Sequence, residues 1–415
     1  MILEKYSFGL GDRFAMEGKA QLKALLRSKE LGVSIVPVWN KSFREHQIIG
    51  TGPEDVRKEA DDAVKALDYL GAYYVDADHI NSGSVAPFIE PSDFFTLDVA
   101  GFIGKPALKT DINEARKYLN KYAGELLIPD MDHPFKIKTD DLDRVLSQYL
   151  LAIQNAGNLY RKLCDRKGED NFIAEVSMDE VEKPQSSMEL FFILALIARE
   201  GINIQTIAPK FSGRFNKGVD YMGQVGEFRK EFEEDLLVIK FAIREFGLPE
   251  NLKLSIHSGS DKFSIYPIMG ELIRKHDMGI HVKTAGTTWL EEVIGLAIGD
   301  QDSLQLVKNI YEDAYGRQEE LCGPYADVIN IDTGALPDPK EVNGWTGERF
   351  ANSIRHIPDH PSYNLNMRQL LHVAYKLAAE KGEKFKKALS DNREIIALQV
   401  EENIFERHLK RLFAN

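Results

Sequence analysis

A histidine, two hydroxyls, a carboxylate and an ammonium group follow one another where an apolar run of the sequence ends. The run covers residues 252–257 and alternates apolar with polar side chains, as a half-buried β-strand does. The polar group that closes it consists of His257, Ser258, Ser260, Asp261 and Lys262. Polar side chains gathered at a strand end are typical of the rim of a site. We therefore predict that Ser258, Asp261 and Lys262 contact a substrate.

Two further strand-like runs, residues 73–78 and 279–283, also carry a histidine on or just past the run. Imidazoles delivered by separate strand ends are a common way for a barrel to assemble a divalent metal site. The predicted ligands of such a metal (Zn, Mn, Ni or Co) are His79, His257 and His281. No compact signature such as His-Glu-x-x-His occurs, so this prediction depends on residues far apart in the sequence.

Two carboxylates are predicted to act as catalytic acid and base. Glu175 lies inside an otherwise apolar run and needs a buried partner, for which a metal or a substrate hydroxyl is suitable. Asp78 ends its run and is a candidate general base, although a carboxylate there could equally cap a loop. Asp179 and Glu180 are expected to begin a loop as solvated charges.

Two orientations stay open at this point. His281 and Lys283 share one face of their strand by the period of two, so one can serve the site while the other is structural. His281 starts its apolar run and therefore lies deeper. Asp78 and His79 alternate, and the sequence does not say which of them points inward.

Positively charged side chains after several predicted strands could hold an anionic or hydroxylated ligand. The segment FGLGDRF (8–14) has two glycines that let a ligand approach the backbone. It is not a dinucleotide fingerprint, because Phe14 stands where the third glycine of GxGxxG belongs. The predicted substrate-binding cations are Arg13, Lys41, Lys210, Lys262 and Lys283.

Strand and helix patterns alternate along the chain. The predicted strands are residues 6–10, 33–38, 73–78, 172–176, 202–207, 252–257, 279–283 and 327–332. Helical patterns lie between them, which implies a mostly parallel sheet and, with eight units, an α/β fold of the closed (β/α)8 TIM-like barrel type. A doubly wound open sheet is the alternative.

The 415 residues are predicted to form a single barrel domain, 1–415. Residues 80–168 are irregular at first and then read as two helices, so we predict a helical cap inserted after the third strand. Residues 335–415 are predicted to be a C-terminal loop and helices that close the barrel.

Composition excludes several classes of partner. A net charge of -13 argues against nucleic acid and against an anionic membrane surface as main partners. With two cysteines, no signal-peptide pattern and no apolar stretch long enough for a span, we expect a cytoplasmic protein without a disulfide framework. The expected partner is a small sugar or uronate, and a homo-oligomer is compatible with the composition.

Four segments together resemble the tagaturonate epimerase family, whose relatives include tagatose 4-epimerases. They are FGLGDRF (8–14), YYVDADHI (73–80), HSGSDKFSIYP (257–267) and HVKTAGTTWLEE (281–292). The third is the most specific, and the resemblance extends over most of the predicted barrel. It implies a divalent-metal-dependent barrel enzyme without nicotinamide, which interconverts tagaturonate and fructuronate.

Such a reaction inverts C4 of the ketose, whose own hydrogen is not acidic because it lies one carbon beyond the α-carbon. Retro-aldol cleavage followed by aldol addition to the other face is therefore the expected route, and transient oxidation is an alternative without a nucleotide motif to support it. A metal-dependent aldose–ketose isomerase or an aldolase would use the same groups. A non-catalytic sugar-binding barrel is the alternative from another class.

Overall fold

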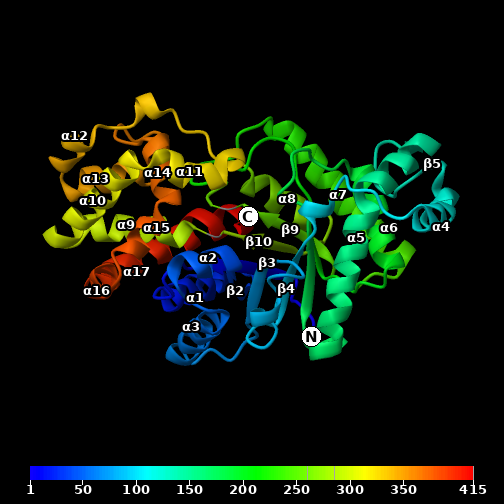
Figure 1. Ribbon diagram of the computed structural model, residues 1–415, viewed down its shortest axis with the longest axis horizontal. Coiled ribbons are helices and arrows are strands. Elements are labelled where there is room, and N and C mark those ends of the chain that lie inside the picture. Colours follow the sequence, from blue (N-terminus) through cyan, green and yellow to red (C-terminus); the bar gives the residue numbers. More distant parts are fainter. Residues whose placement is uncertain (259, 285, 415) are drawn as a thin grey trace.

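Eight parallel strands close into a barrel with helices around it (Figure 1). The structure is a computed structural model that describes residues 1–258, 260–284 and 286–414. Around the barrel the strands lie in the order β1 (Tyr6–Gly11), β10 (Ile280–Lys283), β9 (Lys253–His257), β8 (Thr206–Ala208), β7 (Ile173–Ser177), β4 (Phe94–Asp98), β3 (Tyr74–Ile80) and β2 (Val36–Ser42). β10 pairs with β1, which closes the barrel, so the predicted α/β barrel is confirmed and the open sheet is excluded.

Most strands are followed by helices that run back along the outside of the barrel. The helices up to the last strand are α1 (Gly18–Leu26), α2 (Phe43–Ile49), α3 (Pro53–Ala66), α4 (Lys109–Leu119), α5 (Thr139–Lys167), α6 (Ser187–Arg199), α7 (Val225–Phe246) and α8 (Tyr266–Lys275). Local sequence sets their starts: Ser186 and Glu189 form a capping box at α6, and Pro53 occupies the first turn of α3. Between β3 and β4 the connection contains only the short 3-10 turn η2 (Ala86–Phe88).

The barrel has an apolar layer inside its lower half, separate from the larger core between strands and helices. The inner layer consists of Leu3, Val36, Val38, Tyr74, Phe94 and Ile173. Toward the carboxyl ends of the strands the inward positions turn polar, as at Asp76, Thr96 and Glu175, all of them nearly fully buried. This change from apolar to polar locates the site at the end where barrel enzymes carry their active sites.

One predicted strand was wrong and one real strand was missed. Residues 327–332 do not join the barrel: the amides of Asn330 and Asp332 bond to side chains of α14 (Leu365–Val373), and Val328 accepts from Lys217. The missing strand is β4, whose sequence Phe-Phe-Thr-Leu-Asp lies in a stretch rich in Pro, Phe and Ser. Its pairing with β3 and β7, rather than its local composition, makes it a strand.

The predicted cap over residues 80–168 is not confirmed. The segment contains β4, a barrel strand, and α5, which packs against α6 on the barrel's outside. The added part consists of α4 and the hairpin β5 (Gly124–Leu126) and β6 (Phe135–Ile137). Helix α4 packs on α5 and α6, and the added part lies at the edge of the molecule rather than at its centre (Figure 1).

After β10 the chain is helical. The elements are α9 (Thr287–Ile298), α10 (Gln301–Gly316), α11 (Gln318–Cys322), η6 (Gly323–Val328), η7 (Thr333–Ala335), α12 (Pro339–Asn343), α13 (Gly347–Ile354), α14, α15 (Tyr375–Glu380), α16 (Glu383–Asp391), α17 (Arg393–Glu402), η8 (Asn403–Leu409) and α18 (Lys410–Phe413). α17 packs on both α9 and α1, and α18 packs on α8, so the C-terminal helices cover the barrel wall where β10 meets β1 (Figure 1). A role for residues 335–415 in closing the barrel stays a prediction. Within the described residues, no helix combines the length and apolar composition that a membrane crossing requires.

Candidate active site

Lys283, at the end of β10, lies at the centre of a buried polar group inside the barrel. Its Nζ is 2.7 Å from Asp76 Oδ2 and 3.0 Å from Asp78 Oδ1. The same atom is 3.0 Å from Glu175 Oε1, so two strands, β3 and β7, supply three carboxylates to one ammonium group. Gly9 on β1 makes room for it, since a Cβ there would lie 2.9 Å from Lys283 Cγ. The predicted residues Asp78, Glu175 and Lys283 therefore do converge.

The charges in this group support one another. Burial alone would lower the pKa of Lys283, but the three carboxylates raise it well above its usual value. Burial would likewise raise the pKa of Asp78 and of Glu175, and Lys283 outweighs it and lowers both. Asp76 differs: burial raises its pKa to about 7 despite Lys283. The site thus holds an ionised lysine, two ionised carboxylates and one carboxyl that titrates near neutrality.

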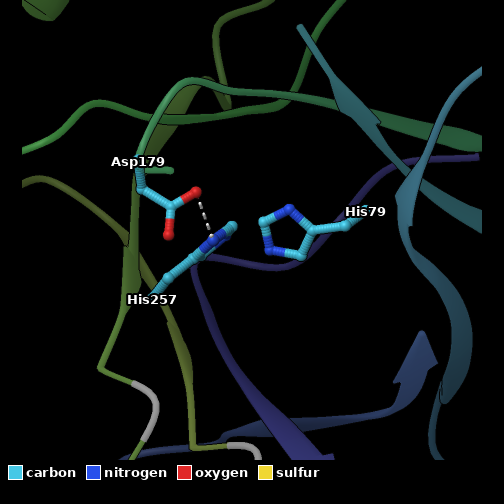
Figure 2. A group of neighbouring side chains, drawn as sticks. All are labelled: His79, Asp179 and His257. Atoms are coloured by element: carbon cyan, nitrogen blue, oxygen red, sulfur yellow. Dashed lines mark ion pairs between the residues drawn. The ribbon is translucent and has the colours of Figure 1, made fainter. Parts of the chain in front are cut away.

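His257, at the end of β9, bridges this group to a further carboxylate. Its Nε2 is 2.8 Å from Glu175 Oε1, and its Nδ1 is 3.2 Å from Asp179 Oδ1 (Figure 2). Burial alone would lower the pKa of His257, but Asp179 and Glu175 raise it to about 10. The Glu175 bond fixes the orientation of the ring and leaves Nδ1 facing Asp179.

His79 reaches the same place through an irregularity of β3. By alternation it would point away from the barrel, but the pairing of β3 with β4 shifts register between Ala77 and Ile80, and His79 adopts a positive φ of 51°. A non-glycine residue in this region is strained, and such strain is concentrated at functional sites. The rings of His79 and His257 lie 5.1 Å apart (Figure 2), so both Asp78 and His79 face the site.

Three of these side chains have the arrangement of a metal site. Ligand atoms of His79, Asp179 and His257 lie within 4.8 Å of one another, and a second group joins His79 to Asp98 and Glu180. The Nδ1 atoms of His79 and His257 are buried without a hydrogen-bond partner among the described residues. Two imidazoles and a carboxylate suit a divalent transition metal, and the Glu175 bond to Nε2 is the carboxylate support that ligating histidines receive.

The whole chain matches one protein family. The family model for tagaturonate epimerase matches residues 1–412. The chain belongs to the tagaturonate epimerase family. The protein is accordingly an epimerase, an enzyme of the isomerase class.

Individual relatives agree with this membership. The chain is 29% identical to the tagaturonate/fructuronate epimerase of Thermotoga maritima over an alignment of 423 positions, which covers 98% of this chain and 80% of the relative. Crystal structures of the fructuronate-tagaturonate epimerase of Cohnella laeviribosi, native and with one bound glycerol, superpose with TM-scores of 0.82 and 0.83 at 24% identity, over 99% of this chain and 82% of theirs. The latter likeness shows the shared fold.

In this epimerase His281 lies apart from the other two histidines predicted as metal ligands. It is fully buried deeper in the barrel, where Nδ1 is 2.9 Å from Ser7 Oγ and the ring packs on Phe94. Burial lowers its pKa to about 3, so the ring is neutral. Among the described residues it belongs to neither metal-like group, and of the pair His281 and Lys283 it is the lysine that reaches the carboxylates.

The polar residues that follow His257 have structural partners instead of facing the metal-like group. Asp261 is fully buried, 2.7 Å from Arg368 Nη2 and 3.1 Å from His356 Nδ1. The Lys262 ammonium donates to backbone carbonyls of the loop after β8 at 2.8 and 3.0 Å. The Ser258 hydroxyl donates to the carbonyl at the end of β10. Their predicted substrate contacts are therefore not supported; these residues hold the β9 loop to its neighbours. Gly259 and Ala285, inside two of the quoted motifs, lie outside the described residues.

The remaining predicted cations have three different positions. Lys41 points outward from β2, and its Nζ donates to the carbonyl of Arg13 at 3.2 Å, so a substrate contact inside the barrel is not supported. The Arg13 side chain pairs with Glu45 at the barrel mouth. Lys210 follows β8 half-buried, and its backbone amide donates to Gln185.

Sequence reasoning missed Asp179, which it treated as a solvated loop charge. Asp179 shares the parity of Glu175 and Ser177, and the Ser177 hydroxyl donates to it. That spacing, two residues beyond the last inward position of β7, was the available signal. Asp76 and Thr96 were also missed as site residues, although each lies on the inward face of its strand.

Proposed function

We propose that this enzyme interconverts tagaturonate and fructuronate by inverting C4 of the ketose, with a divalent metal. The observation that carries the proposal is the position of Lys283 among three carboxylates, directly beside the His79, Asp179 and His257 group. Family membership and the similarity to the tagaturonate/fructuronate epimerase of Thermotoga maritima support the substrate pair.

The metal would be held by His79, Asp179 and His257. When bound, it supplies Lewis-acid stabilisation of the negative charge that develops on the ketone oxygen. Binding requires His257 to give up its Nδ1 proton, because a metal binds the neutral imidazole. Glu175 then keeps the ring oriented through Nε2.

The chain's own groups fit a retro-aldol route. Asp78 is ionised and its side chain is 10% exposed, against 0% for Glu175, so Asp78 is the better placed to accept the proton of the C4 hydroxyl. The C3–C4 bond then breaks, and its electron pair passes into an enediolate on C1–C3 while C4 becomes an aldehyde. Lys283 offers positive charge beside the developing oxyanion. After the aldehyde turns, the bond forms again on its other face and the proton returns.

Glu175 is assigned an orienting role instead of proton transfer. Its oxygens already accept from His257 at 2.8 Å and from Thr206 at 2.7 Å, and Lys283 lies 3.0 Å away. A carboxylate with this many donors is a poor base.

The first test is turnover of tagaturonate by metal-stripped protein before and after addition of Zn, Mn, Ni or Co. We expect metal to restore fructuronate formation. His257→Asn should lower both bound metal, measured by elemental analysis, and turnover by at least about 100-fold, while His133→Asn, on a half-exposed loop residue, should change neither. An aldose product would indicate an isomerase, three-carbon products an aldolase, and binding without turnover a sugar-binding barrel.

The route is tested with substrate deuterated at C4. Retro-aldol chemistry keeps that deuterium and breaks no C4–H bond, so we expect no primary isotope effect and no exchange with solvent. A primary isotope effect with retention would indicate transient oxidation at C4, and loss of the label to solvent would indicate deprotonation there.

A further inference from the structure

A second group of charged and aromatic side chains gathers at the barrel mouth, outside the carboxylate and histidine groups. Its members come from loops and helices that are distant in sequence. They are Arg13 after β1, Arg44 in α2, Lys217 after β8, Tyr325 in η6, His372 in α14 and Tyr375 in α15. We call these six residues the cationic cluster.

The cations of this cluster are held on tyrosine rings. The Arg13 guanidinium lies 4.6 Å from the ring centre of Tyr375, and Lys217 Nζ lies 5.3 Å from that of Tyr325. The two tyrosine hydroxyls are 2.9 Å apart, which links the two halves. Of these cations, Arg13 is paired with the carboxylate of Glu45. The cationic side chains of the cluster are therefore positioned mainly by neutral tyrosine rings, and only Arg13 among them is described in an ion pair with a carboxylate.

The neighbouring groups respond to this excess of positive charge. Burial lowers the pKa of Lys217, and Arg13 lowers it further. Burial alone would raise the pKa of Tyr325, but its bond to Tyr375 and the charges of Arg13 and Lys217 lower it. Both shifts are those expected where an anion would be stabilised.

The N-terminus of α9 lies against the same cluster. Gly286 caps this helix at a φ of 93°, and no described side chain caps it. A Cβ at Gly286 would lie 2.5 Å from His372 Nε2 and 3.3 Å from Arg13 Nη2, so only glycine lets these two groups approach the helix end. His372 is 1% exposed, and its Nε2 has no hydrogen-bond partner among the described residues. A helix N-terminus with a buried, unpartnered imidazole and a guanidinium is suited to an anion.

The cluster is also close to the catalytic groups. Arg13 follows β1, which pairs with β10 and places the cluster at the same end of the barrel as Lys283. The charges of Asp179 and Glu180 also act on Lys217, although more weakly than that of Arg13. Lys217 is thus the member of the cationic cluster whose charge interacts with the acidic residues beside the His79, Asp179 and His257 group. A short sugar acid whose reacting carbons lie at the His79, Asp179 and His257 group would extend its carboxylate end toward Lys217.

We propose that the cationic cluster binds the C6 carboxylate of the substrate and thereby makes the enzyme select keto-uronates over neutral ketoses. This inference rests on the proposed function. Lys217 and Arg13 supply the charge, the Tyr325 hydroxyl supplies a hydrogen bond, and His372 with the N-terminus of α9 forms the end wall. A neutral CH₂OH in this place would leave the cations without a partner, which disfavours it.

The test compares tagaturonate with tagatose in Lys217→Met and in wild type. We expect kcat/KM for tagaturonate to fall about 10- to 100-fold, mainly through KM, and that for tagatose to change less than about twofold. The matched control is Lys121→Met, which removes a lysine stacked 4.7 Å over Tyr122 on the outer edge of the molecule. Equal losses on both sugars, or no loss on either, would overturn the proposal.

A milder variant and a binding measurement keep the test decisive. If Lys217→Met does not fold, Tyr325→Phe removes one hydroxyl, and we expect it to weaken tagaturonate alone by about fivefold. Calorimetric titration with tagaturonate and with tagatose separates this inference from the proposed function. If no sugar is turned over but Lys217→Met loses binding of the acid only, the epimerase proposal fails and the carboxylate site stands.

Discussion

Two lysines that follow the same sequence signal end on opposite sides of the barrel wall. Lys283 and Lys41 each close a buried strand, and both were predicted to hold substrate. Lys283 faces inward, where three carboxylates raise its pKa well above the usual value. Lys41 faces outward between β2 and the helices, where burial lowers its pKa. Strand parity, which a single residue of register decides, separates a site lysine from a structural one.

The carboxylates around the two lysines differ in the same sense. Inside the barrel, Asp78 and Glu175 have lowered pKa values because Lys283 is in direct contact. Outside it, burial raises the pKa of Glu17 to about 8 and those of Glu59 and Glu292 well above the usual range. Asp78 and Glu175 are thus kept ionised by contacts of 3.0 Å with Lys283, whereas the outer group is kept mostly protonated by burial.

The largest expected effect follows from removing the inner lysine. Lys283→Met leaves Asp76, Asp78 and Glu175 buried without their common cation, so we expect a loss of about 3–5 kcal/mol in the free energy of unfolding. Turnover should fall at least about 1,000-fold, because the charge beside the developing oxyanion is gone. Urea denaturation and initial rates check the two effects. A variant that keeps wild-type stability and rate would show that the inner group is not organised by Lys283.

The fold was largely predictable because strands of a parallel barrel are short apolar runs with a polar end. Seven of the strands follow this pattern. The eighth, β4, was not predicted from the sequence because Phe94 and its neighbours lie in a Pro- and Ser-rich stretch. The run at 327–332 has β-branched residues but finds side-chain partners in α14 instead of a strand. Local propensity could not distinguish the two, since pairing across the barrel decides.

Site residues were predictable where strand alternation alone decides which side chains point inward. They were unpredictable where the course of a loop or a register shift decides it. Glu175 and Lys283 lie inward as their strands require. Asp179 reaches His257 only because the chain after β7 continues along the mouth, and His79 does so only through a register shift. The predicted substrate contact of Asp261 stays a prediction, and what the sequence did not indicate is its ion pair with Arg368, more than a hundred positions away. Such long-range partners leave no trace in local spacing.

An intermediate effect is expected from the outer carboxyl Glu17. It is 2% exposed, and burial with the nearby charge of Asp12 raises its pKa from 4.5 to about 8. The folded protein then holds a proton that the unfolded chain releases between about pH 4.5 and pH 8, so stability falls as pH rises through this window. Across it the wild type should lose up to about 4 kcal/mol through this residue.

Glu17→Gln removes this titration and keeps the shape of the side chain. We expect the variant to unfold at a higher temperature than wild type at pH 8 and at a similar one at pH 5, with little change in turnover. Glu90→Gln, an exposed glutamate, serves as the control and should follow the wild-type curve at both pH values. Parallel curves for Glu17→Gln and wild type would mean that Glu17 is ionised in the folded protein and that the outer group is not neutral.

The smallest effect is expected from the outer lysine, and it makes the comparison sharp. Lys41 forms no ion pair with any described residue, and its one hydrogen bond is to the carbonyl of Arg13. Lys41→Met replaces the side chain with an apolar one of similar length, so we expect a loss of about 1 kcal/mol in unfolding free energy and a change in kcat below about threefold. Because Lys41→Met and Lys283→Met are the same substitution at two positions, any difference between them measured under the same conditions is due to position and not to residue type. If Lys41→Met lost as much turnover as Lys283→Met, Lys41 would have to contact the substrate. A lysine on the outer side of the barrel strands cannot otherwise cause so large a loss of turnover.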